Sequence, residues 1–314
     1  MSFSKRGLGY VIDLNQGDNA DSSAPDTFDN GANTLNLDFL RSVASIQSVI
    51  GGDTAFGGRA LLQLWGMKPA DMAQLSTLGF DQAKINKNKV TVFAYDLDDQ
   101  GKKSNEIEVF SGGIFVAHIN YNAMPDVSLE LECYASIGQQ IQMVPGTSVQ
   151  GSGDVATMLQ GICAACDPPV TFVNNGVSAQ LANPAHAGSP AQQIADICTA
   201  SGIAYTLQGE TLTIWNKDQN IDGVIVITGP DNGMVGYPEY TQIGIDVTME
   251  FNPEVQLGRQ LQILQASSGN PPPVPGVPGT FYINIVEHEL SSELPGGPWF
   301  THASVSNIQI VGRN

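Results

Sequence analysis

The chain has 314 residues, of which 42% are hydrophobic, and this is enough for two or three packed domains. Thirty-one acidic residues against 13 basic ones give a net charge of −18, so we expect no binding to nucleic acid phosphates or anionic lipid. No apolar run approaches the ~20 residues that span a bilayer. The two basic residues at the start of the chain are not followed by a continuous apolar run, so we expect no secretory signal and predict that the protein is made and assembled in a cytosol.

The basic residues are unevenly distributed. Between Lys103 and Lys217 there is no Lys or Arg, while the same stretch holds nine acids. Such a charge keeps a monomer soluble, and it would equally give a ring-forming protein an acidic inner wall to which DNA does not adhere. The sequence leaves both interpretations open.

The first 33 residues are predicted to be an N-terminal arm or loop that begins with one short strand, Gly9 to Leu14. The polar stretch Asn15–Asn33 is rich in Asp, Asn, Ser and Gly, which is typical of a long loop or of an arm ordered by a partner. We place the first domain boundary after residue 33.

Residues 34–150 show the pattern of a small β-barrel or sandwich. Leu61–Trp65 is predicted as a strand, and a short helix is predicted from Pro69 to a stop at Gly79. Strands with a turn at 98–105 follow, and Gly112–Gly113 marks a bulge or bend. Next comes a strand that alternates strictly, with Leu129, Leu131 and Cys133 on one face. We expect the helix to close one end of the barrel.

Residues 151–221 change character and predict a small α/β insert after a linker at 146–153. The order is helix, strand, helix and hairpin. Ser189 is a suitable N-cap for the second helix, with Pro190 in its first turn and Gly202 at its end. The hairpin turns at Gln208–Gly209.

Residues 222–314 return to alternating β patterns. A Pro- and Gly-rich loop at 267–280 interrupts them. After it, two long strands are joined by a Pro-Gly-Gly-Pro turn. The predicted fold class is therefore mainly β with an α+β insert, in which two β-barrel domains flank a small α/β domain.

The four cysteines are too few for a disulfide framework. Cys163 and Cys166 form a CxxC, but it comes late in a predicted helix, where no helix N-terminus stabilises a thiolate. The sequence has no second CxxC to complete a zinc site. We predict that Cys133, Cys198 and the CxxC pair are buried structural thiols, with redox or metal use as the alternative.

The four histidines form no known ligand signature. His118 falls in a predicted strand and is interpreted as a sheet residue, and His186 lies in the insert. His288 and His302 flank the Pro-Gly-Gly-Pro turn and could face each other across a hairpin beside Glu287 and Glu289, where a metal site is conceivable.

Catalytic patterns are weak. Gly151–Ser152–Gly153 lies in a predicted linker and lacks the strand–turn–helix setting of a nucleophile elbow. The glycine-rich stretch 51–59 has no following Lys-Ser/Thr for a phosphate. No carboxylate pair stands in an aromatic-rich context, as a glycosidase would need. We predict no enzyme activity, no catalytic, cofactor-binding or metal-binding residue, and no cofactor.

Turn and packing motifs in the last third of the chain resemble those of a known family. They are Gly229–Pro230, Val235–Gly236–Tyr237–Pro238, Phe251–Asn252–Pro253, Leu257–Gly258, and the strand with His288 that leads to Pro-Gly-Gly and Trp299. Residues 177–216 are similar to the insert of the same proteins. These features resemble the baseplate hub proteins of contractile-tailed bacteriophages, the Mu-like hub and late-control-protein-D group. The resemblance covers about 60–314, with its specific part at about 177–305, and the stretch Asn15–Asn33 has no counterpart.

The resemblance implies two tail-tube-like β-barrel domains, at 34–150 and 222–314, in a structural virion protein of the phage tail baseplate. Such proteins form homotrimers whose duplicated domains make a pseudo-sixfold ring. The ring adapts the hexameric tail tube to the trimeric central spike, with baseplate wedge proteins around it and the tape measure protein as a further partner. DNA passes through the channel during ejection without specific binding.

Two other functions remain open at this point. Another tube-fold tail adaptor, such as a tube initiator or distal tail protein, would have one tube-like domain per chain. A baseplate-borne cell-wall hydrolase would need a cleft with converging titratable side chains.

Overall fold

The computed structural model describes residues 5–14, 27–50, 58–76, 88–122, 124–242, 244–265 and 279–309. Of the described residues, 52% are in strands and 13% in helices, which confirms the predicted mainly β fold class. In these ranges no helix is long and apolar enough to cross a bilayer. The four-part domain division predicted from the sequence stays a prediction.

Contacts group the chain into two compact units. Unit 1 comprises Met1–Ile46, Arg59–Ile137 and Glu289–Trp299, and unit 2 comprises Gln47–Gly58, Gly138–His288 and Phe300–Asn314. The unit boundaries therefore fall within long strands as well as in loops.

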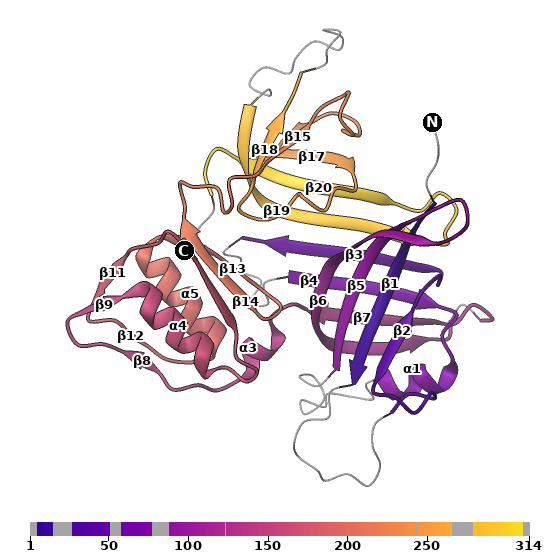
Figure 1. Ribbon diagram of the computed structural model, residues 1–314, viewed down its shortest axis with the longest axis horizontal. Coiled ribbons are helices and arrows are strands. Elements are labelled where there is room, and N and C mark those ends of the chain that lie inside the picture. Colours follow the sequence, from indigo (N-terminus) through magenta and orange to yellow (C-terminus); the bar gives the residue numbers. More distant parts are fainter. Residues whose placement is uncertain are drawn as a thin grey trace. The chain divides into compact units, whose positions relative to one another are not determined.

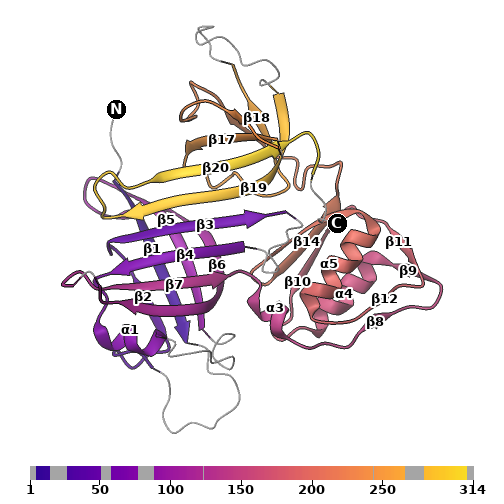
Figure 2. The ribbon, with the colours of Figure 1, turned by 180° about the vertical axis from the view of Figure 1, so that it is seen from behind.

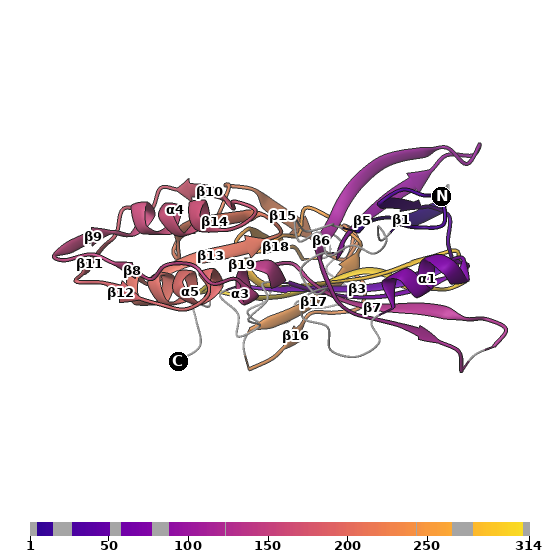
Figure 3. The same ribbon diagram turned by 90° about the horizontal axis from the view of Figure 1, so that it is seen from below.

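Unit 1 is built on an antiparallel sheet with strand order β2-β1-β5-β6-β7-β4-β3. Its strands are β1 (Lys5–Leu14), β2 (Thr34–Leu37), β3 (Ser42–Val49), β4 (Gly58–Trp65), β5 (Asn88–Leu97), β6 (Lys103–Asn120) and β7 (Ser128–Tyr134). Figure 1 shows β1, β2 and β5 crossing β4 and β7 steeply, and Figure 3 shows the two sets in separate layers joined by the curved β6.

The bend of β6 has a local cause. Its pairing with β7 shifts register between Ile114 and Val116, which is the irregularity that the glycine pair predicted. A Cβ at Gly112 would lie 2.6 Å from the carbonyl oxygen of Tyr134, so only glycine allows this approach of the two backbones.

Strict alternation places the apolar side chains of both layers in the core of unit 1. Leu129, Leu131 and Cys133 are buried, as their spacing predicts. Across the core, Val90 and Val92 of β5 are fully buried together with Leu8, Tyr10 and Ile12 of β1. The predicted first strand is thus confirmed, but it begins at Lys5 and pairs with β5 along its whole length.

Helix α1 (Pro69–Leu75) begins at the predicted proline but ends earlier than predicted. Ser76 already has an extended backbone, because hydroxyl side chains compete with helical hydrogen bonds and favour helix ends. Of the predicted arm Asn15–Asn33, residues 15–26 lie outside the described residues. Phe28 is buried, and the backbone N–H of Asp29 donates to Asp71 at 2.8 Å.

Unit 2 contains the predicted α/β part, in which two helices pack on a three-stranded sheet of order β10-β14-β13. The elements are α4 (Val155–Ala165), β10 (Thr171–Asn175), α5 (Pro190–Ser201), β13 (Ile203–Gln208) and β14 (Thr211–Asn216). Figure 2 shows the helices beside these strands. Ser189 caps α5 by accepting from Gln192 N–H, and Gly202 ends it with φ +66°, both as predicted.

The predicted linker at 146–153 is wrong. Its residues belong to two short strands that pair with a later segment and close the α/β part. These are β8 (Thr147–Ser148) with β12 (Ala185–His186), and β9 (Ser152–Asp154) with β11 (Gln180–Ala182). Strands this short carry no periodicity, so a sequence rich in Gly and Ser conceals them. The short helix α3 (Ile137–Ile141) precedes them.

The β part of unit 2 carries two sets of strands on the long strand β19. One runs β16-β17-β20-β19, and the other adds β18 and β15 to β19. The strands are β15 (Ile225–Thr228), β16 (Glu239–Tyr240), β17 (Ile245–Glu250), β18 (Gln260–Ile263), β19 (Gly279–Ser292) and β20 (Trp299–Ser306). The two long strands around the Pro-Gly-Gly-Pro turn are confirmed. Most of the predicted Pro-rich loop, residues 267–278, lies outside the described residues.

Trp215 joins the α/β part to the β part of unit 2. It is fully buried in the core that also holds Val247, Leu261 and Ile283. Its indole N–H donates to Gln309 at 2.7 Å, so the polar end of the ring is satisfied inside the core. Gly258 lies directly against the ring, where a Cβ would come within 2.5 Å.

Substituting Gly258 tests this packing. Gly258 and Gly223 share the same φ of +79°, but nothing lies within 4 Å of a Cβ at Gly223. Gly258→Ala should lower the free energy of unfolding by about 2–4 kcal/mol, since it adds overpacking to backbone strain. Gly223→Ala should cost only about 1 kcal/mol, from strain alone. Chemical denaturation of both variants measures the difference, and equal losses would contradict the contact.

Candidate functional site

The most developed polar surface of unit 1 is the face of β4, β6 and β7 that points away from the core. We call it the polar face, and its side chains come from alternate positions opposite the buried leucines. The pairing sets His118 and Gln63 on either side of Glu130, and Leu61 beside Glu132. The polar face comprises Arg59, Gln63, His118, Asn120, Glu130 and Glu132.

Glu130 is the centre of this face. One of its carboxylate oxygens lies 2.9 Å from His118 Nε2, and the other accepts from Asn120 at 2.7 Å and from Gln63 at 3.3 Å. Gln63 also donates to the hydroxyl of Ser128 at 3.1 Å. Side chains from the two neighbouring strands, β4 and β6, therefore hold the Glu130 carboxylate in a fixed orientation.

Glu132 lies two residues further along the same face of β7. Arg59 forms an ion pair with it at 2.7 Å, and the hydroxyl of Tyr134 donates to it at 2.6 Å. Tyr134 also packs edge to face on Phe115, with 5.5 Å between ring centroids. Burial raises the pKa of the Tyr134 phenol, and its hydrogen bond to Glu132 acts in the same direction.

The electrostatics of the polar face do not suit phosphate binding. Arg59 and His118, its two basic side chains, both face carboxylates within an ion-pair distance. A phosphate would have to displace a carboxylate that is already hydrogen-bonded. The arrangement is also unlike an acid–base pair, because other side chains hold each carboxylate. Both basic side chains of the polar face are thus already engaged by carboxylates.

Unit 2 has a comparable face on β17 and β20. The hydroxyl of Ser304 donates to Asp246 at 2.6 Å, and the Thr248 hydroxyl lies 2.9 Å from His302 Nδ1. Val247 and Met249, at the alternate positions of β17, are buried in the core. Both units thus contain a sheet with one apolar and one polar face.

The thiols are buried, as predicted. Cys163 lies within α4, and Cys166 at the C-cap of this helix donates to the carbonyl of Ile162 at 3.3 Å. Burial raises the pKa of Cys163 to about 12 and also raises the pKa values of Cys133, Cys166 and Cys198. These thiols therefore stay protonated at neutral pH, and protonated thiols are poor nucleophiles.

The histidines lie in different surroundings. His118 is 58% exposed on the polar face, and His186 lies in β12. His288 is buried, with Nδ1 2.9 Å from the hydroxyl of Thr301 and the ring edge to face with Phe251. His302 turns to Thr248 instead. No group of three metal-ligating side chains occurs in the described part of the chain, which includes Glu287 and Glu289.

The structure also gives no catalytic arrangement around the other two sequence patterns, Gly151–Ser152–Gly153 and the glycine-rich stretch 51–59, in their described residues. Ser152 lies in β9, and its hydroxyl donates to the side-chain oxygen of Gln180 at 2.8 Å. This hydrogen bond, within the described strand pair of β9 and β11, does not involve a histidine. Of the glycine-rich stretch 51–59, residues 51–57 lie outside the described residues, and the rest begins β4.

The sequence analysis assigned no site to the polar face, although its alternation pattern places two of the six residues. The alternation through Leu129 and Leu131 already places Glu130 and Glu132 together on the opposite face of one strand. Nothing in the sequence indicates that Gln63 and Arg59 are their partners. The register between β4 and β7 decides this pairing, and Gln63 and Glu130 are 67 residues apart in the sequence.

His288 should make the stability of the protein fall in acid. Burial lowers its pKa to about 4, with a smaller contribution from His302. Between pH 6.5 and 4 the unfolded chain then binds a proton that the folded chain does not, so stability falls as the pH falls through this window. His288→Gln should remove about 2 kcal/mol of the loss measured between pH 7 and pH 5 by denaturant unfolding.

The exposed His118 supplies the matched control. His118→Gln replaces the same residue type at an exposed position, so any general effect of exchanging a histidine for glutamine would appear in both variants. An equal response of the two variants would show that the burial of His288 does not control this effect.

A comparison with protein families gives one match. Residues 74–301 match the family described as "Baseplate hub gp41". That segment includes β7 and all of unit 2 between α3 and β19. No curated protein matches the chain.

Solved structures of tail proteins share the fold. A tail protein from Neisseria meningitidis MC58 superposes with a TM-score of 0.59 at 9% identity, covering 96% of each chain. The 43 kDa tail protein of prophage MuSo2 from Shewanella oneidensis gives 0.55 at 10% identity, covering 99% of this chain and 100% of that one. The E. coli c3393 protein, a type VI secretion component, gives 0.54 at 7% identity, covering 88% and 76%.

Proposed function

This chain belongs to the baseplate hub gp41 family, and we propose that it is a non-enzymatic subunit that forms a ring in a phage tail baseplate. Membership confirms the resemblance to phage baseplate hubs seen in the sequence, and the shared fold of bacterial and prophage tail proteins agrees with it. A place in the virion follows from the family. The ring, its stoichiometry and its partners are the proposed part.

The observation that carries the proposal is the construction of the two units. Each holds a sheet whose apolar face packs inward and whose other face is polar. Two such units per chain would give a trimer six similar wall segments, which matches a hexameric tube on one side and a trimeric spike on the other. We propose the tail tube protein and the central spike as axial partners, and wedge and tape measure proteins as further partners.

The polar face of unit 1 is proposed to line the channel of this ring. A lining for DNA passage must be hydrated but must not hold phosphates. Glu130 and Glu132 meet this requirement, because their ion pairs leave Arg59 and His118 turned toward carboxylates. The side chains on this face are also fixed by hydrogen bonds across strands, so they would not project into the channel.

The absence of a catalytic role is part of the proposal. The candidate nucleophiles are a serine bonded to Gln180 and thiols whose burial keeps them protonated. Among the described residues, no hydrogen bond joins either of them to a base of the kind that activation requires.

The ring itself is directly testable. The purified chain at micromolar concentration should elute as a closed oligomer, with the mass of a trimer by multi-angle light scattering. Negative-stain images should show a ring with a central hole. A stable monomer would contradict the proposal, and clearing of peptidoglycan in a gel would favour the hydrolase alternative.

Reversing the charge of the polar face should create a DNA-binding channel. Glu130→Lys with Glu132→Lys places four units of positive charge change per chain inside the ring, where a concave wall concentrates the field. This variant should bind a short DNA duplex in a gel-shift assay at least ten times more tightly than the control. Binding should weaken steeply between 50 and 200 mM salt, as phosphate contacts do.

The control for this experiment carries the same charge change at two exposed acids of unit 2, Asp218→Lys with Glu254→Lys. If both variants bind DNA equally, the polar face is not a channel lining. Melting curves of each variant verify that the fold is retained.

A further inference from the structure

Three asparagines of the chain are followed directly by glycine. They are Asn30, Asn175 and Asn232. In such a pair the backbone nitrogen of the glycine can attack the side-chain carbonyl carbon of the asparagine, because glycine has no Cβ that would obstruct the approach. The attack requires that the side chain can turn toward this nitrogen and that no other acceptor holds the glycine N–H. The hydrogen bonds of the folded chain therefore decide which pair can react.

The backbone angle and the space around the glycines do not distinguish the three pairs. Gly31, Gly176 and Gly233 have φ values of +74°, +80° and +73°. All three are exposed, and a Cβ built on any of them would meet no atom closer than 3.9 Å. A difference in reactivity between the pairs must therefore come from the hydrogen bonds of each pair.

Both reacting groups of the first pair are engaged. The N–H of Gly31 donates to the carbonyl of Phe28 at 2.8 Å. The side-chain oxygen of Asn30 accepts from the N–H of Ala32 at 2.9 Å. Attack of the Gly31 nitrogen on the Asn30 side chain must break both hydrogen bonds, which raises the barrier of the reaction.

The side chain of the second pair is held by the fold. Asn175 is half-buried in β10, where its backbone pairs in parallel with Trp215 of β14. Its side-chain amide donates to the carbonyl of Ile221 at 2.7 Å. The amide can turn toward Gly176 only after this bond is broken, so the fold also protects Asn175.

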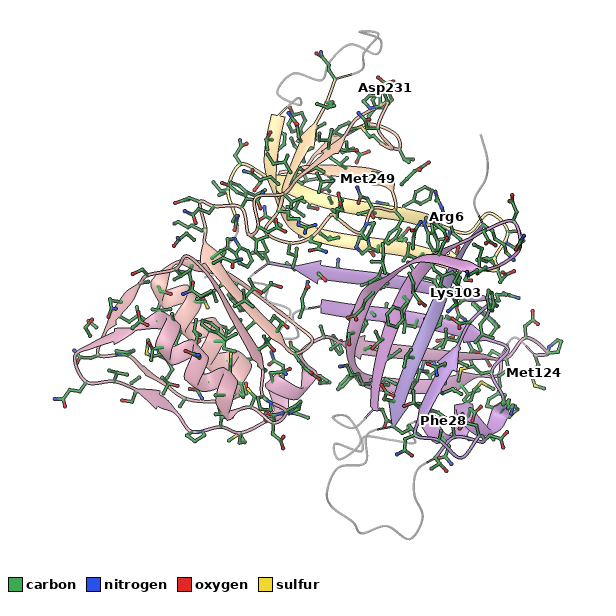
Figure 4. The ribbon with its side chains drawn as sticks, viewed as in Figure 1. Arg6, Phe28, Lys103, Met124, Asp231 and Met249 are labelled. Carbon is green, nitrogen blue, oxygen red and sulfur yellow. The ribbon has the colours of Figure 1, made fainter. Side chains whose placement is uncertain are left out.

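The third pair lies in the exposed turn that follows β15. Figure 4 shows Asp231, the residue before Asn232, in this turn. The N–H groups of Asn232 and Met234 both donate to the carbonyl of Gly229, at 2.8 and 3.1 Å. Among the described residues, no hydrogen bond engages the side chain of Asn232 or the N–H of Gly233. Here the side chain can turn and the attacking nitrogen is available.

We propose that Asn232 deamidates spontaneously in the folded protein, while the fold protects Asn30 and Asn175. The Gly233 nitrogen gives its proton to water and bonds to Cγ of Asn232. The bond from Cγ to the amide nitrogen breaks, and ammonia leaves. Water then opens the resulting five-membered imide at either carbonyl, which yields aspartate or isoaspartate. The net reaction consumes one water and releases one ammonia, with no change in oxidation state.

The products alter the outer side of β17. Each adds a negative charge, and isoaspartate also adds one atom to the main chain before Gly233. The carbonyl of Gly233 accepts from the N–H of Glu250 at 2.7 Å, and the N–H of Val235 donates to Thr248 at 2.8 Å. An extra main-chain atom directly before these contacts disturbs their register, so the modified chain should open more readily along β17.

Ageing of the purified full-length chain tests the proposal. The protein is kept at mildly alkaline pH, and samples are digested with pepsin in acid, which stops the reaction. Mass spectrometry of the peptides measures conversion of each amide to an acid. Conversion at Asn232 should be at least about ten times faster than at Asn30 or Asn175, as expected when other pairs must first break one or two hydrogen bonds. Isoaspartyl methyltransferase should label the same peptide.

Two controls separate the effect of the fold from that of the sequence. In concentrated urea the three pairs should react at similar rates, because the hydrogen bonds that distinguish them are lost. Asn232→Gln, whose longer side chain would have to close a six-membered ring, should abolish the conversion at this position and leave Asn30 and Asn175 unchanged. Its melting temperature should match that of the unchanged protein, since the side chain is exposed.

Hydrogen exchange measures the structural consequence. The amide of Glu250 should exchange faster in the aged protein than in the equally aged Asn232→Gln variant. Equal exchange of this amide in the two proteins would contradict the disturbed register along β17.

The rates in the folded protein decide the proposal independently of the proposed function. Equal conversion at the three pairs, or slower conversion at Asn232 than at either of the others, would overturn it. Neither result bears on whether the chain forms a ring, which light scattering measures separately.

Discussion

The alternation of side chains across each β-strand is the constraint on which this structure depends. Because the period is two, the residues that fill the core of unit 1 also fix which residues make up the polar face. A slip of one residue in the pairing of β7 would bury Glu130 and Glu132 and expose Leu129 and Leu131. The free energy of burying the leucines therefore also orients the carboxylates, and no separate device is needed to hold the polar face outward.

The same constraint explains how tail proteins with about one residue in ten in common share this fold. A sheet with one apolar and one polar face specifies only the class of residue at each position, and many side chains satisfy it. A particular residue is required where backbones approach closely or turn sharply. Gly112 beside β7 and Gly258 against Trp215 are two such positions, because in each a Cβ would overlap its neighbour.

Basic residues are distributed unevenly between the two units. Unit 2 holds few of them, and the two basic side chains on the polar face of unit 1, Arg59 and His118, contact the carboxylates of Glu132 and Glu130. In the ring proposed above, this distribution would leave both basic side chains of the polar face directed at carboxylates instead of at DNA phosphates.

The sequence by itself determined the local features. The core positions Leu129, Leu131 and Cys133, the N-cap Ser189, the stop at Gly202 and the mainly β class all follow from periodicity and backbone preference, which act over a few residues. Only the tertiary structure decided the partners of Glu130, the pairing of β1 with β5 and the short strands at 147–154. Each of these depends on hydrogen bonds between segments far apart in the chain, and no local pattern encodes which distant strand a given strand will meet.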